Sequence, residues 1–137
     1  MANVLYPKWK EARLQSTANA ALDGTGATGV YAALVDTGTY TYNAAHQFYS
    51  DLTGIVGTDQ EITTKTFTNG LFDGADISHP AVSGASAEAI VLYVKNAGAN
   101  TTWRLVGYID TGVTGLPVTP NGGAINTTWN ASGIFQL

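Results

Sequence analysis

The sequence contains no cysteine and few charged residues. The absence of cysteine excludes disulfide bridges, Cys-ligated zinc, iron–sulfur clusters and thiol catalysis. Only 12% of the residues are charged, which is about half the usual share for a soluble domain. Charged residues keep free surfaces soluble and are depleted from interface cores, so this composition favours a chain whose surface is partly covered by partners.

The chain also lacks a basic face, a long apolar run and a signal peptide. Its formal net charge of -4 argues against nucleic-acid binding, which requires a positively charged surface. No stretch approaches the length of apolar sequence that spans a bilayer, and residues 1–8 show no charged start followed by an apolar core. We therefore expect no nucleic-acid partner, no membrane partner and synthesis in a cytoplasm.

Short apolar or Thr/Tyr-rich runs separated by Gly, Asn, Asp and Pro dominate the chain from residue 24 onward. The length of 137 residues suits a single domain. The clearest strands are residues 30–35 and a hairpin of residues 87–95 and 102–109 around the loop 96–100. Further strands are predicted at residues 39–42, 62–67, 124–129 and 133–135. We predict an all-β fold, an antiparallel β-sandwich over residues 24–137, with jelly-roll and immunoglobulin-like topologies both open.

Residues 1–23 differ in character and are predicted to form an N-terminal arm or short helix. Lys8, Lys10 and Arg13 are half of the six basic residues of the chain. Pro7 is typical of a helix start, and the helix is expected to reach about residue 19 with Trp9 on its apolar face. Such an arm can dock on its own domain or on a neighbouring subunit.

Two Asp-Thr-Gly triplets, Asp36-Thr37-Gly38 and Asp110-Thr111-Gly112, each close an apolar run. This is the aspartic-peptidase signature, whose chemistry needs two carboxylates that share one proton. Two-lobed peptidases of this type are far longer, and single-lobed ones bring one triplet per subunit. An Asp side chain also opens turns, and Gly supplies a positive φ. We predict two turns, and a peptidase that uses Asp36 and Asp110 is the remote alternative.

No other pattern indicates catalysis or a cofactor. His46 and His79 lack a second ligand at metal-binding spacing, and neither a phosphate loop nor a nucleophile elbow is present. We therefore predict no enzymatic activity, no cofactor and no metal. Tyr40 and Tyr42 share one face of a predicted strand, where they could stack on a sugar. Anchoring in a core or an interface is the favoured interpretation of these two aromatic side chains.

Several segments along the chain carry a resemblance to a known family. They are residues 1–3 and 6–12 (MAN, YPKWKEA), 33–40 (ALVDTGTY), 88–93 (EAIVLY), 108–112 (YIDTG), 115–123 (GLPVTPNGG) and Ile134-Phe135. Together they resemble a family of small virion structural proteins of tailed bacteriophages, and the resemblance spans almost the whole chain. It transfers no catalytic motif.

The resemblance implies a virion protein made in the bacterial host cytoplasm, with the major capsid protein or other virion proteins as partners. Among such roles, a capsid decoration or cement protein that self-associates as a trimer or dimer suits a compact β-sandwich best. A tail, neck or fibre component and a carbohydrate-binding surface module are the alternatives. The arm is the candidate contact with an acidic capsid surface, and Trp9 is its expected anchor. The full set of candidate contact residues is Lys8, Trp9, Lys10, Arg13, Tyr40 and Tyr42.

Overall fold

The computed structural model describes residues 3–137, which form an all-β, sandwich-like fold with one short α-helix. The largest sheet is antiparallel, with the order β1-β7-β6-β2-β3. Its strands are β1 (Val4–Leu5), β7 (Arg104–Ile109), β6 (Ala89–Val94), β2 (Val30–Val35) and β3 (Ile55–Glu61). Two smaller antiparallel pairs are β4 (Leu71–Phe72) with β9 (Phe135–Gln136) and β5 (Ile77–His79) with β8 (Ile125–Thr127). The predicted fold class is confirmed.

Strands β6 and β2 form the centre of the main sheet because their sequences are apolar at both alternate sets of positions. All six residues of β6 are buried, as are all residues of β2 except Tyr31. A strand that packs on both faces needs such a continuous apolar run. The predicted hairpin of β6 and β7 is confirmed, and the short 3-10 turn Asn100–Thr102 lies in its connection.

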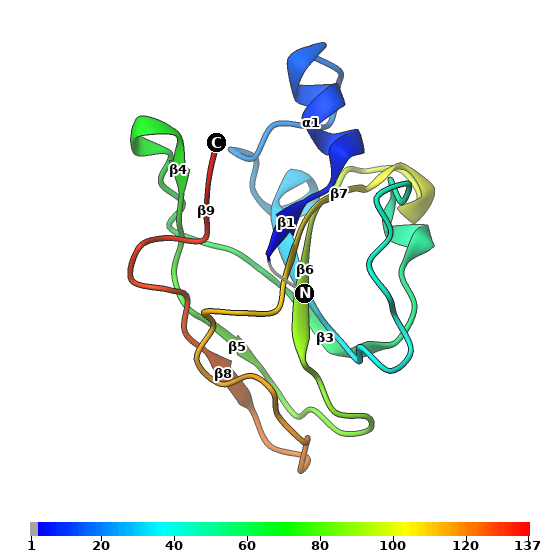
Figure 1. Ribbon diagram of the computed structural model, residues 1–137, viewed down its shortest axis with the longest axis vertical. Helices are drawn as coiled ribbons and strands as arrows, with labels where there is room; N and C mark the ends of the chain where they lie inside the picture. The colour runs from blue at the N-terminus through cyan, green and yellow to red at the C-terminus, as the bar shows by residue number, and fades with distance from the viewer. Residues whose placement is uncertain (1–2) are drawn as a thin grey trace.

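The two faces of the main sheet are covered by different structures. Figure 1 shows the pairs β4–β9 and β5–β8 on one side and the irregular segment 36–53 on the other. The register places Tyr31 opposite Tyr93 and Tyr108 opposite Val91, so these three tyrosines share one face. Tyr40 and Tyr42 of the segment 36–53 contact Tyr108. We call this side the tyrosine face and the opposite side the small-sheet face.

All seven tyrosines of the chain belong to the tyrosine face. Tyr6 and Tyr49 join it through ring contacts with Tyr42 and Tyr93. The small-sheet face is aliphatic on the sheet itself, with Leu34, Ile90 and Leu92 fully buried. The strands of the main sheet therefore carry tyrosines on one face and aliphatic side chains on the other.

The N-terminal segment is joined to the main sheet by β1, which pairs with β7. Helix α1 (Pro7–Leu14) follows and begins at Pro7 as predicted. It ends earlier than predicted, because Gln15 leaves the helical conformation and Ser16 takes φ 52. Trp9 and Ala12 are the residues of α1 that are buried.

Two predicted strands are wrong. Residues 39–42 form no strand, because Tyr40 and Tyr42 turn toward the sheet rather than pairing with it. Residues 62–67 contain only one isolated bridge, and the strand lies earlier, at β3. The sequence of β3 is polar at several positions, and a bulge around Gly57 (φ 73) breaks the alternation that would have identified it.

No helix among residues 3–137 has the length and apolar character needed to cross a bilayer. The α-helix in this part of the chain, α1, has eight residues.

Candidate functional site

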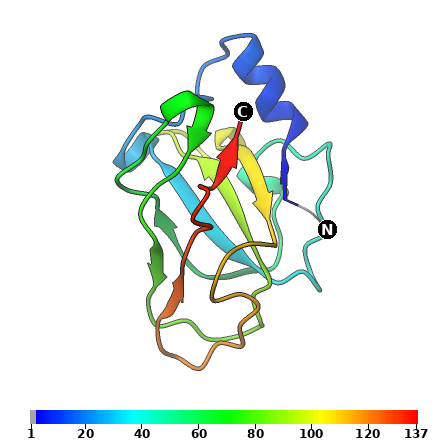
Figure 2. The same cartoon turned by 60° about the vertical axis from the view of Figure 1, so that its left-hand side comes forward.

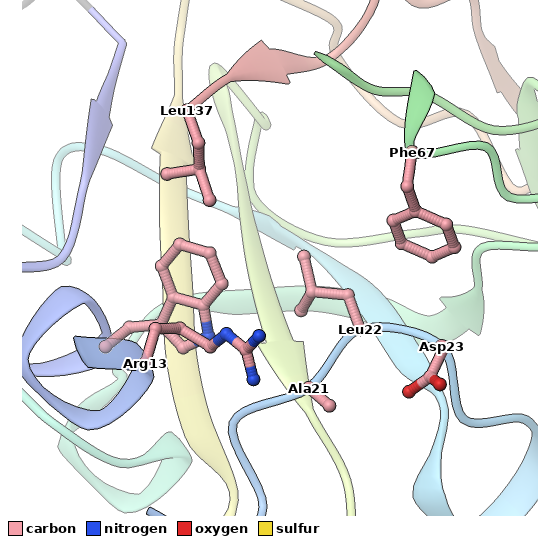
Figure 3. Close-up of a pocket in the computed structure, with 7 residues that line it drawn as sticks. Arg13, Ala21, Leu22, Asp23, Phe67 and Leu137 are labelled. Atoms are coloured by element: carbon pink, nitrogen blue, oxygen red, sulfur yellow. The ribbon is translucent and has the colours of Figure 1, made fainter. Parts of the chain in front are cut away.

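Helix α1, strand β4 and the C-terminus lie at the same end of the molecule (Figures 1 and 2), and a groove lies there between their side chains. It encloses about 370 Å³. Figure 3 shows Arg13 on one side of it, Asp23 on the other and Leu22 between them. We call it the end groove. Its lining residues are Trp9, Arg13, Ala21, Leu22, Asp23, Phe67 and Leu137.

The end groove coincides with the exposed apolar side chains of the fold. Among residues 3–137, the large hydrophobic side chains that are exposed are Leu14 (88%), Phe67 (45%) and Leu137 (67%). Phe67 and Leu137 line the groove, and Leu14 follows Arg13 at the end of α1. Exposed apolar groups gathered in one place indicate an interaction surface, whereas single ones are ordinary.

The chain reversal beside Phe67 explains why this ring is presented to solvent. Asn69 and Gly70 take φ values of 56 and 77, so the chain turns back on itself immediately after Phe67. The ring of Phe67 lies 5.7 Å from that of Phe72, which is buried. Phe67 therefore sits on the edge of the core with one part of its ring outside.

Charged groups of opposite sign flank the apolar floor of the end groove. Arg13 and Asp23 are exposed, and neither side chain has an ion-pair or hydrogen-bond partner within residues 3–137. The exposed Lys10 of α1 has no such partner in that range either. Lys8 differs, because its Nζ donates to Glu11 Oε2 at 3.0 Å. Lys10 and Arg13 are therefore the basic groups of α1 that are available to a partner.

The expectation that Trp9 anchors the arm on a partner is wrong. Only 1% of Trp9 is exposed, and its Nε1 donates to the carbonyl oxygen of Ala20 at 2.8 Å. Its ring meets Phe135 edge-on, with centroids 5.8 Å apart. Trp9 docks α1 on its own domain. Transfer of its large apolar ring from water into the core stabilises the fold. It contributes only the wall of the end groove.

Tyr40 and Tyr42 do not form the sugar-stacking platform considered from the sequence. Tyr40 is 2% exposed, and its hydroxyl contacts Tyr6 Oη at 2.7 Å and His46 Nδ1 at 2.9 Å. Tyr42 is partly exposed and packs against Tyr6 and Tyr108. Core anchoring, the favoured interpretation, is confirmed for Tyr40.

The two Asp-Thr-Gly triplets leave the main sheet at the same end, because β2 and β7 both run antiparallel to β6. Leu34 and Ile109 both lie opposite Ile90, so Asp36 is two residues beyond that level and Asp110 is one residue beyond it. Since successive side chains of a strand point to opposite faces, the two carboxylates start from opposite faces of the sheet. A peptidase dyad needs them about 3 Å apart.

The first triplet forms a turn, as predicted, whereas the second forms a bend, and different groups hold the two. In the first, Asp36 Oδ1 accepts from Gly38 N at 2.9 Å, and Thr37 N and Oγ1 both donate to Glu88 Oε1 at 2.9 Å. In the second, Asn3 Oδ1 accepts from Asp110 N at 2.9 Å and from Thr111 N at 3.0 Å. The predicted positive φ occurs at Gly112 (76) and not at Gly38.

The two histidines lie apart in separate packing environments. His79 is fully buried, and its Nε2 lies 3.2 Å from the carbonyl oxygen of Ala32. Burial disfavours the charged form of the His79 imidazole and therefore lowers its pKa. His46 lies against Tyr40. Within residues 3–137 no group of three His, Asp or Glu side chains is arranged to hold a metal ion.

The sequence prediction missed the apolar residues of the end groove, Leu22, Phe67 and Leu137. Phe67 had one local signal, because it is a single aromatic residue within a polar stretch, residues 63–70 (TTKTFTNG). Leu22 and Leu137 carry no such signal, since only the fold brings them beside α1.

Comparison with known proteins does not extend this description. No protein-family model matches the chain, and a search of curated proteins finds no match.

Proposed function

We propose that this chain is a non-enzymatic structural protein of a tailed-bacteriophage virion and, within that role, a decoration protein of the head. The observation that supports the role best is the end groove, which combines the exposed side chains of Phe67 and Leu137 with the unpaired Arg13 of α1. The low content of charged residues and the resemblance to small phage virion proteins point in the same direction. The location of the protein would then be the virion.

The partner we propose for the end groove is an apolar side chain of the major capsid protein with acidic residues beside it. Leu14, Phe67 and Leu137 would bury apolar area, which supplies most of the affinity of such contacts. Lys10 and Arg13 would face the acidic groups and orient the contact. A protein that binds only the mature lattice stabilises that lattice by mass action, which is how a decoration protein strengthens a head.

The test adds purified chain to heads assembled without it and measures the bound fraction by sedimentation. Phe67→Ser and Leu137→Ser together should lower the affinity at least tenfold, and Arg13→Glu should weaken binding most at low salt. Thr119→Ala, which changes an exposed residue outside the end groove, is the matched control. Wild-type binding by the groove variants would overturn the proposed contact.

Cryo-electron microscopy of the particle tests the assignment itself. Density for this chain on the head lattice, as trimers or dimers, is expected. Density confined to the tail, neck or fibres would replace the decoration role by the alternative structural one. The remote peptidase alternative is tested by Asp36→Asn and Asp110→Asn, which should leave assembly unchanged.

A further inference from the structure

A second concave site lies on the tyrosine face and shares no lining residue with the end groove. It is an open depression of about 340 Å³ beside the bulge of β3. Four of its nine lining residues are aromatic, one is acidic and one is basic. The residues that the argument uses are Tyr31, Tyr49, Asp59, Tyr93, Lys95 and Trp103.

The four aromatic rings come from four separate segments and touch one another. Tyr93 of β6 is the buried floor, and the rings of Tyr31 and Trp103 lie nearly parallel to it, each with centroids 5.9 Å away. Tyr49 meets Tyr93 at 4.6 Å and Trp103 at 5.3 Å. Tyr31, Tyr49 and Trp103 remain partly exposed, so apolar ring surface borders the depression.

Hydrogen bonds fix each of these rings in place. Asp59 Oδ2 accepts from Tyr49 Oη at 2.8 Å and from Tyr93 Oη at 2.7 Å. Trp103 Nε1 donates to the carbonyl oxygens of Asn96 and Gly98, and Tyr31 Oη donates to that of Gly26. Burial, and then the nearby carboxylate of Asp59, raise the pKa of Tyr49 and Tyr93, so both phenols stay protonated donors. The depression is therefore rigid before any ligand arrives, which reduces the entropy cost of binding.

Two charged groups lie at this site, and the basic one, Lys95, has donors available to a ligand. The Nζ of Lys95 lies 4.5 Å from the ring centroid of Tyr31 and 4.9 Å from that of Trp103, and it has no ion-pair partner within residues 3–137. Asp59 Oδ1 is buried and has no hydrogen-bond partner in that range. Lys95 therefore offers the site a strong donor beside aromatic surface, and the buried carboxylate of Asp59 offsets its charge.

We propose that this depression binds a neutral saccharide, such as a glycan of a bacterial surface. A sugar ring presents C–H groups that pack on aromatic rings and hydroxyl oxygens that accept hydrogen bonds, which matches the ring surface and the ammonium of Lys95. A simple anion would meet the carboxylate of Asp59, and a simple cation would meet the ammonium of Lys95. This binding function is independent of the proposed contact with the head and goes beyond it.

The tryptophans of this chain provide a direct readout. Trp103 is the partly exposed one, whereas Trp9 and Trp129 are 1% and 6% exposed and do not line the depression. The full chain is screened against an array of neutral bacterial glycans, and soluble hexasaccharides of glucose, mannose, galactose and N-acetylglucosamine are titrated to millimolar concentration. At least one of these probes should shift the Trp103 emission along a saturable curve.

Variants separate binding from general packing. Lys95→Met keeps the alkyl chain, removes the donor and should weaken the positive probe at least tenfold, and Trp103→Ala should abolish the fluorescence response. Lys65→Met is the matched loss of one positive charge outside the depression and should bind the probe as the wild type does. An unchanged affinity in Lys95→Met, or no binding to any array glycan or soluble probe, would overturn the proposal. Neither of these two results bears on binding to heads. The saccharide proposal and the decoration proposal can therefore be refuted independently.

Discussion

The tyrosine face and the small-sheet face pack the same central strands by different means. On the tyrosine face, side-chain hydrogen bonds connect the rings to one another and to the rest of the chain, as in the pair of Tyr6 with Tyr40 and the two phenols on Asp59. On the small-sheet face, Leu34, Ile90 and Leu92 pack without polar groups of their own. The comparison teaches that one sheet can have an apolar core on one side and a rigid, partly polar aromatic layer on the other. The proposed saccharide site belongs to the second kind.

The largest difference between the faces should appear when a buried side chain is shortened on the aliphatic side. Leu92→Ala leaves a cavity at a fully buried position and should lower the free energy of unfolding by about 3 kcal/mol. Urea denaturation followed by circular dichroism measures this loss. Leu137→Ala, at a position that is 67% exposed, is the control and should change it little. A loss below about 1 kcal/mol for Leu92→Ala would mean that this face is not close-packed.

On the tyrosine face, the corresponding change is the removal of a shared acceptor. Asp59→Ala leaves the phenols of Tyr49 and Tyr93 without their acceptor and should cost about 2 kcal/mol of unfolding free energy. Adding Tyr49→Phe and Tyr93→Phe removes the stranded donors and should restore part of that loss. Mutant cycles that combine Asp59→Ala with each Tyr→Phe change, followed by urea unfolding, quantify the coupling. Strict additivity would mean that Asp59 and the two phenols have no coupling energy and would contradict the stabilising role of these hydrogen bonds.

Acid should act on the small-sheet face through His79 of β5. Burial lowers the pKa of this imidazole below its usual 6.5, so the unfolded chain binds the proton more readily. The stability that neutral His79 contributes is complete above about pH 6.5 and falls as the pH drops toward the folded pKa. The difference between the urea unfolding midpoints at pH 7.5 and at pH 5 should therefore be larger for the wild type than for His79→Gln. Equal shifts in both proteins would contradict this role.

Alkali should act on the tyrosine face, with no effect near neutral pH. Burial raises the pKa of Tyr6, Tyr49 and Tyr93 above the ordinary value of 10.0. The unfolded chain therefore loses phenol protons first, and the stability that these protonated phenols provide is lost as the pH rises above about 10. Phenolate absorbance during an alkaline titration should rise together with unfolding. Complete tyrosine ionisation in a still-folded chain would contradict the packing described.

The sequence predicted the elements in which hydrophobicity alone decides the structure. Residues 30–35 and 89–94 are apolar or aromatic at the positions that point to both faces of the sheet. This pattern is typical of a central strand, and both strands were predicted. Tyr40 and Tyr42 were misplaced because alternating Thr and Tyr is equally compatible with a strand and with an irregular segment packed on a sheet. The strand β3 was missed because its bulge and its polar residues interrupt the alternation of apolar and polar residues that is typical of a strand.

The candidate sites were harder to predict because distant segments build both of them. Trp9 has the composition of an interface anchor, and only the fold shows that Phe135 and Ala20 bury it. The end groove needs Leu22, Phe67 and Leu137 in one place, and the aromatic depression needs residues from 31 to 103. No local sequence pattern encodes the proximity of such distant residues. Lys10 and Arg13 were predicted as candidate contact residues from sequence because charged side chains are mostly exposed.

The contact of Asn3 with the bend at Asp110 and Thr111 has a consequence for the order of events during synthesis. These residues are separated by more than a hundred positions, and β1 pairs with β7 across a similar interval. Strand β1 leaves the ribosome first but cannot pair until β7 has been synthesised. This edge of the sheet therefore stays unpaired until residue 111 has emerged. Contacts of such long range slow folding. A nascent chain halted before that point would keep α1 unanchored from the sheet.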